Sequence, residues 1–270
     1  MTIIGIATYI FILLLIGFSS YKKQKTSADY ILGGRSLNYV LTATSAHASD
    51  MSSWLFLGFP AAIFVGGLFK VWLAVGLVVF MTLNWLFVAP SIRIKTEEYD
   101  SMTLSSFFES RFNDTSGLIR VVTAIICFIF YTIYISAGLY GVGISVEKLF
   151  NIPYGFGVIA GVIIIVPYLY IGGYKTLAWI DLFQALFLLL VILFVPLYII
   201  PKIGGINTLY ESLNSYGRTN ALIPNFAPST FLAIFYSLCT WGLGYFGQPH
   251  IITKFMGIND PKKLKKSMFV

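Results

Sequence analysis

A carboxylate stands in the middle of a long apolar stretch, in the segment SAHASDMSSWLFLGFP at residues 45–60. At the centre of a membrane helix Asp50 would cost roughly 2.5–3.5 kcal/mol, so it needs a partner or a wet cavity. One chemistry that fits is binding of a small cation, shared with backbone carbonyls freed where a helix breaks. The other is a helix cap, in which the carboxylate accepts hydrogen bonds from free amides near Ser52 or Ser53. The residue types leave both open.

A second stretch of the same kind, CTWGLGYFGQPH, occupies residues 239–250. Like ATSAHASDMSSW at residues 43–54, it is rich in small, polar and helix-breaking residues inside an apolar segment. A straight lipid-facing helix has no use for such residues, whereas a helix broken at mid-membrane exposes backbone groups that can line a cavity. The two stretches therefore predict two discontinuous helices, a pattern that points to the binding site of a secondary transporter.

The composition places these stretches in a membrane protein with several spans. Hydrophobic residues make up 57% of the 270 residues and charged residues 11%, against about 25% charged residues in soluble domains. Cys127 and Cys239 lie in apolar runs and are expected to be buried packing residues rather than a disulfide or a metal site. We recognise no catalytic triad, metal cluster or phosphate-binding loop, and GGYKT at residues 172–176 lacks the Walker spacing. Neither an enzyme nor a cofactor beyond a coupling ion is expected.

Seven membrane-spanning helices are expected, because seven apolar runs reach the approximately 20 residues that a helix needs to cross hydrocarbon. The expected spans are residues 2–21, 37–69, 71–92, 118–147, 154–173, 177–200 and 229–256. The first is expected to be a retained helix rather than a signal peptide, since Lys22 and Lys23 follow it instead of preceding it. The segment LSSFFESRF, at residues 104–112, is expected to form a short interfacial helix with Thr103 as its N-cap.

The basic residues predict the orientation of these spans. With the N-terminus outside, four of the 18 Lys and Arg residues fall outside and the other fourteen fall in the cytoplasm. The four outer residues are Lys70, Lys148, Lys202 and Arg218. This asymmetry follows the positive-inside rule, so the net charge of +7 is a topology signal and does not indicate nucleic-acid binding. A multi-pass cell-membrane protein with a cytoplasmic C-terminus is expected. The tail DPKKLKK is either its positive-inside flank or a contact with anionic lipid.

The spacing of the two interrupted helices predicts a fold class. If the first span is peripheral, they are the first and sixth of the remaining spans, as in an all-α, LeuT-type transporter with a five-plus-five inverted repeat. The expected division is a peripheral helix and loop at 1–36, a first five-helix repeat at 37–200, an external loop at 201–228, and the start of a second repeat at 229–270. Four more helices would complete the second repeat, so a second polypeptide that supplies them is an expected partner.

Four stretches carry a resemblance to a known family. They are DYILGGRSLNYVLTATSAHASDMSSWLFLGFP (29–60), FYTIYISAG (130–138), IGGYKTLAWIDLFQ (171–184) and WGLGYFGQPHI (241–251). In these stretches the chain resembles the N-terminal half of sodium/solute symporters, and the last stretch resembles the proline-transporting branch more than the sugar or vitamin branches. The resemblance implies a membrane transporter that uses Na⁺ as its coupling ion.

The resemblance also implies roles for particular residues. Sodium coordination is implied for Ala48 and Met51 through their carbonyls, for Asp50, and for Ser52, which lies where the ion and substrate sites meet. Substrate binding or gating is implied for Ser52, Trp54, Gly58, Tyr134, Asp181, Trp241, Tyr245 and Pro249.

Each of these residues also has a structural interpretation. The aromatic residues fit ordinary packing with satisfied polar groups, and Gly58 fits a close helix contact. Pro249 fits a helix break, and Asp181, a few residues inside its helix, fits an inner-surface salt bridge. His47 and His250 fit buried hydrogen bonding as well as titration.

The expected function is sodium-coupled uptake of a small solute, with L-proline as the substrate implied by the resemblance. His47 and Ser53 depart from the proline branch, which has glycine at both positions, and they add bulk beside the break. Two alternatives remain: a truncated or split symporter that is inactive without the missing helices, and a symporter-like sensory module. The expected partners are the solute, sodium and membrane lipid.

Overall fold

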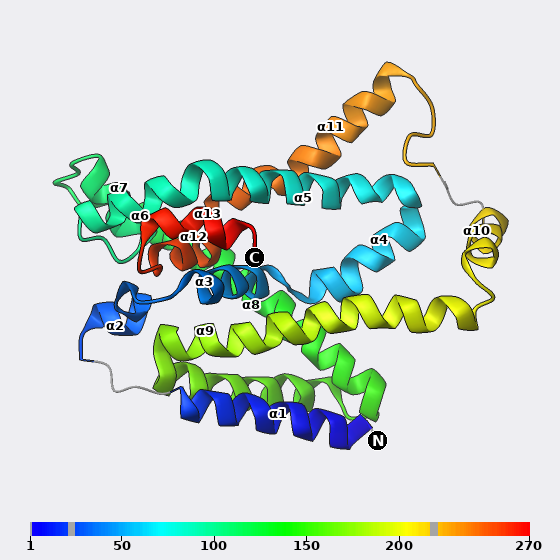
Figure 1. Ribbon diagram of the computed structural model, residues 1–270, viewed down its shortest axis with the longest axis horizontal. Helices are drawn as coiled ribbons and strands as arrows, with labels where there is room; N and C mark the ends of the chain where they lie inside the picture. Colours follow the sequence, from blue (N-terminus) through cyan, green and yellow to red (C-terminus); the bar gives the residue numbers. More distant parts are fainter. Residues whose placement is uncertain (1, 21–24, 217–220) are drawn as a thin grey trace. The chain divides into compact units, whose positions relative to one another are not determined.

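The computed structural model describes residues 2–20, 25–216 and 221–270. Lys22, Lys23 and Arg218, which contributed to the predicted orientation, lie outside the described residues. The described part is mainly helical, and its one β-type pairing is an isolated parallel bridge between Leu37 and Ile258 (Figure 1). The prediction of an all-α chain is confirmed.

The chain forms two compact units. Unit 1 contains residues Met1–Ser53, Ala89–Phe183 and Pro249–Val270. Unit 2 contains residues Trp54–Val88 and Gln184–Gln248. The division predicted from span counting, at residues 36, 200 and 228, follows the repeat rather than compactness and stays a prediction.

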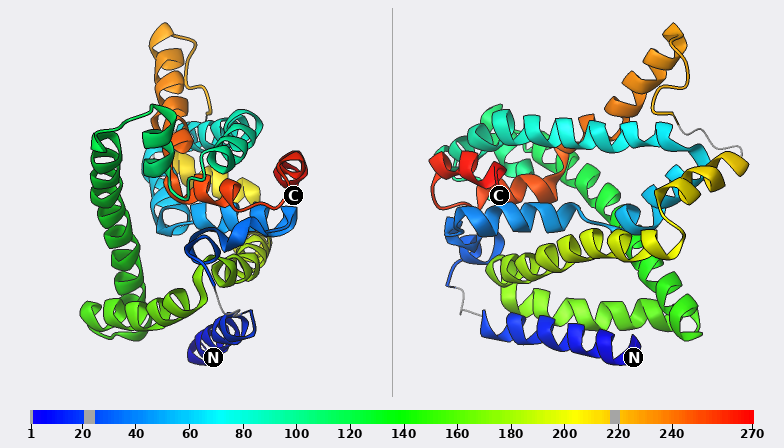
Figure 2. Two further views of the ribbon diagram at one scale, coloured as in Figure 1. Left: turned by 90° about the vertical axis from the view of Figure 1, so that its left-hand side faces the viewer. Right: turned by 45° about the vertical axis from the view of Figure 1, so that its right-hand side comes forward.

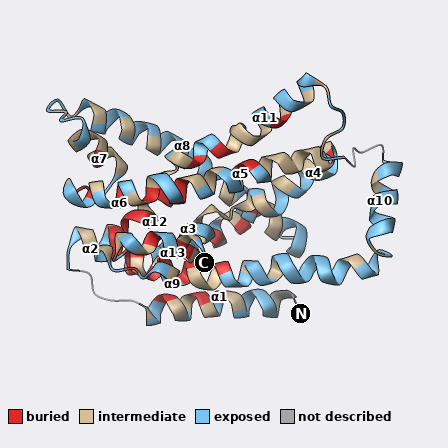
Figure 3. Cartoon of the chain, turned by 45° about the horizontal axis from the view of Figure 1, so that its top comes forward, coloured by how far each residue is buried: buried red, intermediate tan, exposed pale blue. Residues whose placement is uncertain are grey.

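In the described residues, unit 1 is built from eight α-helices, part of a ninth, and two short 3₁₀ segments. They are α1 (Thr2–Ser19), α2 (Ser27–Leu32), η1 (Gly33–Arg35), α3 (Tyr39–Asp50), α6 (Ala89–Glu98), α7 (Leu104–Arg111), α8 (Leu118–Phe150), α9 (Tyr154–Lys202) as far as Phe183, α12 (Pro249–Met256), η6 (Pro261–Lys263) and α13 (Leu264–Met268). Helix α12 packs on α3 and α6, and α13 packs on α3. The buried residues gather on these helices, whereas α1 and α8 are largely exposed (Figure 3).

Unit 2 holds the remaining elements. They are η2 (Trp54–Gly58) and η4 (Asn84–Val88), which are π-helical, η3 (Leu68–Lys70) and η5 (Leu243–Gly247), which are 3₁₀ helices, and α4 (Phe59–Gly66), α5 (Val71–Leu83), α10 (Ile206–Ser215), α11 (Pro228–Gly242) and the rest of α9. Its most extensive packing is between α5 and α11.

Both predicted helix breaks are present. Helix α3 ends at Asp50, and Met51 has an extended backbone before the chain resumes as the π-helical turn of η2. Helix α11 gives way at Gly242 to the 3₁₀ helix η5, and Gln248 is extended before α12 begins at Pro249. Proline can occupy the first position of a helix because the missing N–H has no intrahelical partner there. The prediction of two discontinuous helices is therefore confirmed.

Within the described residues, four helices are long and apolar enough to cross a membrane, or five if the broken pair around residues 51–53 is one span. They are Leu68–Glu98, Leu118–Phe150, Gly172–Lys202 and Pro228–Gly247. The other two expected spans coincide with shorter apolar helices, Ile4–Ser19 and Tyr154–Pro167. Helix α8 is a single 33-residue rod that turns into α9 at residues 151–153 (Figure 2). Within α9, Gly173 adopts φ 58° and ψ −163° and separates the two predicted spans.

The short helix predicted at residues 104–112 is present as α7, while its interfacial position stays a prediction. The Thr103 hydroxyl accepts a hydrogen bond from the Ser106 N–H at 3.1 Å, and Ser106 Oγ accepts one from the Thr103 N–H at 3.1 Å. This reciprocal pair satisfies two donors at the helix start. The predicted N-cap at Thr103 is confirmed.

Candidate functional site

The first break exposes the carbonyl end of α3 beside a carboxylate. The Met51 N–H is shared between the carbonyls of His47, at 3.3 Å, and Ala48, at 3.2 Å. The last carbonyls of a helix lack intrahelical partners and carry the negative end of its dipole, which favours a cation. Asp50 is half-buried at this end, and in the described residues its carboxylate accepts no hydrogen bond from the amides of Ser52 or Ser53. The capping alternative therefore has no contact to support it.

Within unit 1, Ser52 lies beside two aromatic rings. The hydroxyls of Ser52 and Tyr134 are hydrogen-bonded, and Asp50 is close enough to Tyr134 to interact with it electrostatically. The His250 ring stacks on Tyr134 with centroids 5.4 Å apart and an interplanar angle of 20°. Unit 1 thus brings Asp50, Ser52 and Tyr134 together with His250, the residue that follows Pro249.

Unit 2 carries a second group of predicted site residues. The rings of Trp54 and Trp241 meet edge to face, with centroids 5.2 Å apart. Gly58 lies against the Trp54 ring, and a Cβ there would clash with it, so glycine lets the indole fold back over the π-helical turn. Tyr245, in η5, is 1% exposed. These contacts are the close packing that was one interpretation of the glycine and the aromatic residues.

The second broken helix is held by a stripe on α5 and η4 at spacing four, Gly76, Phe80 and Asn84. A Cβ on Gly76 would clash with the backbone of Leu238, and the Phe80 ring occupies the space beside Gly242.

The same stripe continues to the break itself. The Phe80 ring meets Phe246 at 5.6 Å, and the Asn84 amide donates to the Tyr245 carbonyl at 3.1 Å. Asn84 is fully buried, and its Oδ1 has no partner in the described residues. Residues four apart lie on one face of a helix, so α5 follows α11 down to the break.

Asp181 is buried in unit 1 in an ion pair. Lys254 donates to its Oδ2 at 2.8 Å, and the Ser45 hydroxyl donates to the same oxygen at 2.5 Å. The side chains of Lys254 and Asp181 are only 4% and 7% exposed. The Lys254 ammonium also lies 5.1 Å from the centroid of the Tyr174 ring, whose hydroxyl donates to the Thr253 carbonyl. The salt-bridge interpretation of Asp181 has a direct contact, while a gating role stays a prediction.

The guanidinium groups of Arg35, in η1, and Arg93, in α6, hold the end of α12 and the residues after it. Gly33, Gly34 and Arg35 all have positive φ, which is unusual for arginine. The Arg35 guanidinium donates to the carbonyls of Thr96, Ser101 and Met256 at 3.0–3.1 Å. Arg93 donates from Nε to the Ile258 carbonyl at 2.8 Å.

The start of α2 fixes the other end of that loop. The backbone N–H groups of Lys25 and Thr26 each donate to Asp29 Oδ2 at 3.1 Å. These hydrogen bonds, the one from Lys25 foremost, hold the pKa of Asp29 below its ordinary value because they stabilise the ionised carboxylate.

The model of the sodium:solute symporter family matches residues 30–270. The sodium/proline symporters of Staphylococcus aureus strains JH9 and NCTC 8325 are each 37% identical over 268 residues, covering 98% of this chain and 52% of theirs. The chain belongs to the sodium:solute symporter family. It spans about half the length of these curated relatives.

A solved structure shares the fold of this sodium:solute symporter chain. A Na⁺-coupled sialic acid symporter, solved in a substrate-bound outward-open state, superposes with a TM-score of 0.80 at 19% identity. The match covers 97% of this chain and 54% of that one. The LeuT-like fold class predicted from the two broken helices is confirmed, as is the family, and the chain is a multi-pass membrane protein.

Three buried polar residues, Lys254, Arg93 and Asn84, contact the second broken helix or the chain after it and were not singled out from the sequence. The signal for Lys254 was a lone cation among apolar residues in PHIITKFM. No group of three or more His, Cys, Asp and Glu side chains in the described part of the chain is placed to hold a metal ion.

Proposed function

We propose that this chain contributes to sodium-coupled uptake of a small solute, with L-proline as the substrate. The observation that carries the proposal is the exposed carbonyl end of α3 beside the Asp50 carboxylate, which forms no hydrogen bond or ion pair with the described residues. The similarity to the sodium/proline symporters of Staphylococcus aureus supports the choice of ion and solute.

The proposed sodium site joins the carbonyls of Ala48 and Met51 to the Asp50 carboxylate and the Ser52 hydroxyl. Hard monovalent cations suit such oxygen donors, and the end of α3 adds its dipole. Because Ser52 also bonds to Tyr134, an ion held here orders a hydroxyl pair that faces the solute. Ion and solute then favour each other's binding through linkage.

Each unit carries residues that we propose for solute binding or gating. In unit 1 they are Tyr134 and Pro249, and in unit 2 they are Trp54, Gly58, Trp241 and Tyr245. Rocking of one helix bundle against the other exposes the bound ligands to each side in turn. The proposed orientation has the N-terminus outside, and the proposed site is completed by helices that correspond to the rest of the longer relatives.

Uptake of radiolabelled L-proline into vesicles, with and without an inward sodium gradient, tests this function. The chain is assayed alone and together with a polypeptide that supplies the remaining helices of a full-length version. We expect sodium-driven accumulation only in the second case, and unlabelled proline should compete while sialic acid should not. Equal uptake with potassium replacing sodium would refute the coupling ion, and uptake of another solute in preference would refute proline.

A further inference from the structure

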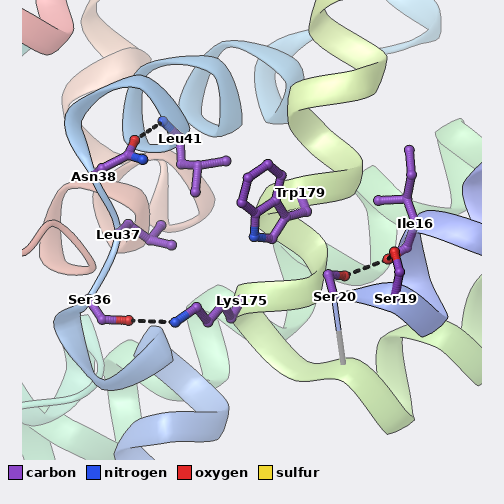
Figure 4. Close-up of a pocket in the computed structure, with 9 residues that line it drawn as sticks. All are labelled: Ile16, Ser19, Ser20, Ser36, Leu37, Asn38, Leu41, Lys175 and Trp179. Atoms are coloured by element: carbon purple, nitrogen blue, oxygen red, sulfur yellow. Dashed lines mark hydrogen bonds between the residues drawn. The ribbon is translucent and has the colours of Figure 1, made fainter. Parts of the chain in front are cut away.

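A cavity of about 590 Å³ lies in unit 1, away from the Asp50 and Tyr134 group (Figure 4). Three elements surround it: the end of α1, the segment that leads into α3, and the part of α9 that follows the Gly173 kink. None of the residues assigned to the ion or solute site lines it.

One wall of the cavity is apolar. Ile16 comes from α1, Leu41 from α3 and Trp179 from α9, and the indole of Trp179 lies between the other two elements (Figure 4). Trp179 is 41% exposed although it lines a cavity. Tryptophan is enriched where membrane meets water, because its ring is amphipathic.

The other end of the cavity carries one cation and no anion. The Lys175 ammonium donates to the Ser36 hydroxyl at 3.3 Å, and that hydroxyl donates in turn to the Gly33 carbonyl at 2.7 Å. All eleven acidic residues of the chain lie in its described part, and none of them forms an ion pair with Lys175. Lys175 therefore keeps donors and a full positive charge for a ligand.

An amide also lines the cavity, on the segment that leads into α3. Asn38 Oδ1 accepts the Leu41 N–H at 2.8 Å, which fixes the amide as the cap of α3 (Figure 4). In the described part of the chain its Nδ2 group donates to nothing, so it is a second donor in the cavity lining.

We propose that this cavity binds an anionic phospholipid. The phosphate accepts hydrogen bonds from the Lys175 ammonium and the Asn38 amide, and one acyl chain lies along Ile16, Leu41 and Trp179. A free phosphate ion would leave the apolar wall and most of the volume empty. A zwitterionic lipid would bring its own ammonium to a cavity whose one charge is positive, so the charge favours phosphatidylglycerol.

The lipid would also add a contact between α1 and α9. The Tyr9 ring of α1 meets the Phe183 ring of α9, with centroids 5.7 Å apart. An acyl chain between Ile16 and Trp179 would fill the space beside this contact, since lipid fills interhelical gaps that side chains do not. This proposal is independent of which solute the chain carries.

Native mass spectrometry of the purified full chain tests the proposal. Palmitoyl-oleoyl phosphatidylglycerol is titrated against the phosphatidylcholine of the same chains, with and without inorganic phosphate. We expect tighter binding of phosphatidylglycerol and a loss of about fivefold in Lys175→Gln, the worth of one lysine near an anionic lipid. Lys148→Gln, which removes a lysine elsewhere on the chain, is the matched control and should bind as the wild type does.

A second variant separates the pocket from the charge. Ile16→Trp fills the cavity from α1 and keeps Lys175, so it should abolish phosphatidylglycerol binding while the unfolding temperature stays near that of the wild type. Equal binding of both lipids, an unchanged Lys175→Gln, or tight binding by a folded Ile16→Trp would each overturn the proposal. Displacement of the lipid by inorganic phosphate alone would show an anion site without a lipid and would also overturn it.

Discussion

Lys254 and Asp181 form an ion pair 2.8 Å long in the interior of unit 1, joining α12 to α9. The Ser45 hydroxyl from α3 donates to the same carboxylate oxygen, so three helices meet at one buried charge. A buried pair of this kind costs desolvation to form, yet breaking it leaves an uncompensated charge. Its stabilising effect therefore shows only when one partner is removed and the other remains.

Replacing Lys254 with Met should destabilise the protein by about 3–5 kcal/mol, because Asp181 is left buried and unpaired. The double variant Lys254→Met with Asp181→Asn should recover most of that loss, since no charge remains. Chemical unfolding of the purified variants measures both. Lys263→Met is the matched control. Lys263 and Asp260 are both exposed and their charged atoms lie 4.0 Å apart, and a surface pair of this kind contributes about 0–1 kcal/mol to stability. A double variant as unstable as the single one would contradict this account.

The approach of α5 to α11 at Gly76 predicts a steric effect. A Cβ at this position would clash with the backbone of Leu238, which cannot move aside as a flexible side chain does. Gly76→Ala should therefore destabilise the protein by about 1–3 kcal/mol, the usual cost of overpacking. Gly138→Ala in α8 is the control: no atom lies within 4 Å of its added Cβ, so the change should stabilise the helix by about 0.5–1 kcal/mol. Thermal unfolding in detergent shows whether each variant is more or less stable than the wild type. A Gly76→Ala variant as stable as the wild type would contradict the close packing of α5 on α11.

The hydrogen bond from Asn84 to the Tyr245 carbonyl predicts a local effect at the second break. Asn84→Ala removes this buried hydrogen bond, at a cost of about 0.5–1.5 kcal/mol. Thr82→Ala on the same helix removes only an exposed hydroxyl that bonds to Val78 and should be nearly neutral. In an assembled transporter Asn84→Ala should raise the KM for the solute more than it lowers kcat, because it loosens η5 around Tyr245. A fall in protein abundance with an unchanged KM would show a purely structural role.

The places where the helices break were predictable because their causes are local. Pro249, the extended residues at 51 and 248, and the small residues around them act within a few positions of themselves. The N-cap at Thr103 was predictable for the same reason. The polar and apolar patterns of the sequence therefore predicted the helices, their interruptions and the fold class.

The partners of the buried charges were not predictable, because they lie far apart in the chain. Asp181 and Lys254 are 73 residues apart, and Arg35 and the Met256 carbonyl are 221 apart. Each charge alone fits a membrane-surface position, and only the packing of α12 on α3 and α6 shows that it is paired. The stripe from Gly76 to Asn84 was hidden for a related reason, since α5 is apolar except for Thr82 and the sequence does not mark one of its faces as the packed face.

Asp50 gives the test of the proposed sodium site. In an assembled, transport-competent protein, Asp50→Asn removes a charge from the end of α3 while keeping the size of the side chain. A unit charge about 4 Å from a cation is worth roughly 1–4 kcal/mol between water and a protein surface, so the sodium concentration for half-maximal uptake should rise by about tenfold or more. Asp50→Glu keeps the charge, so its sodium concentration for half-maximal uptake should lie between those of the wild type and Asp50→Asn.

The matched control for charge is Asp260→Asn, which removes an exposed carboxylate near the end of the chain. It should leave the sodium dependence unchanged. Uptake is measured at saturating solute while sodium is varied, with protein abundance determined in the same membranes. If Asp50→Asn keeps the wild-type sodium dependence at normal abundance, the carboxylate does not serve the ion, and the open end of α3 must be explained by its backbone carbonyls alone.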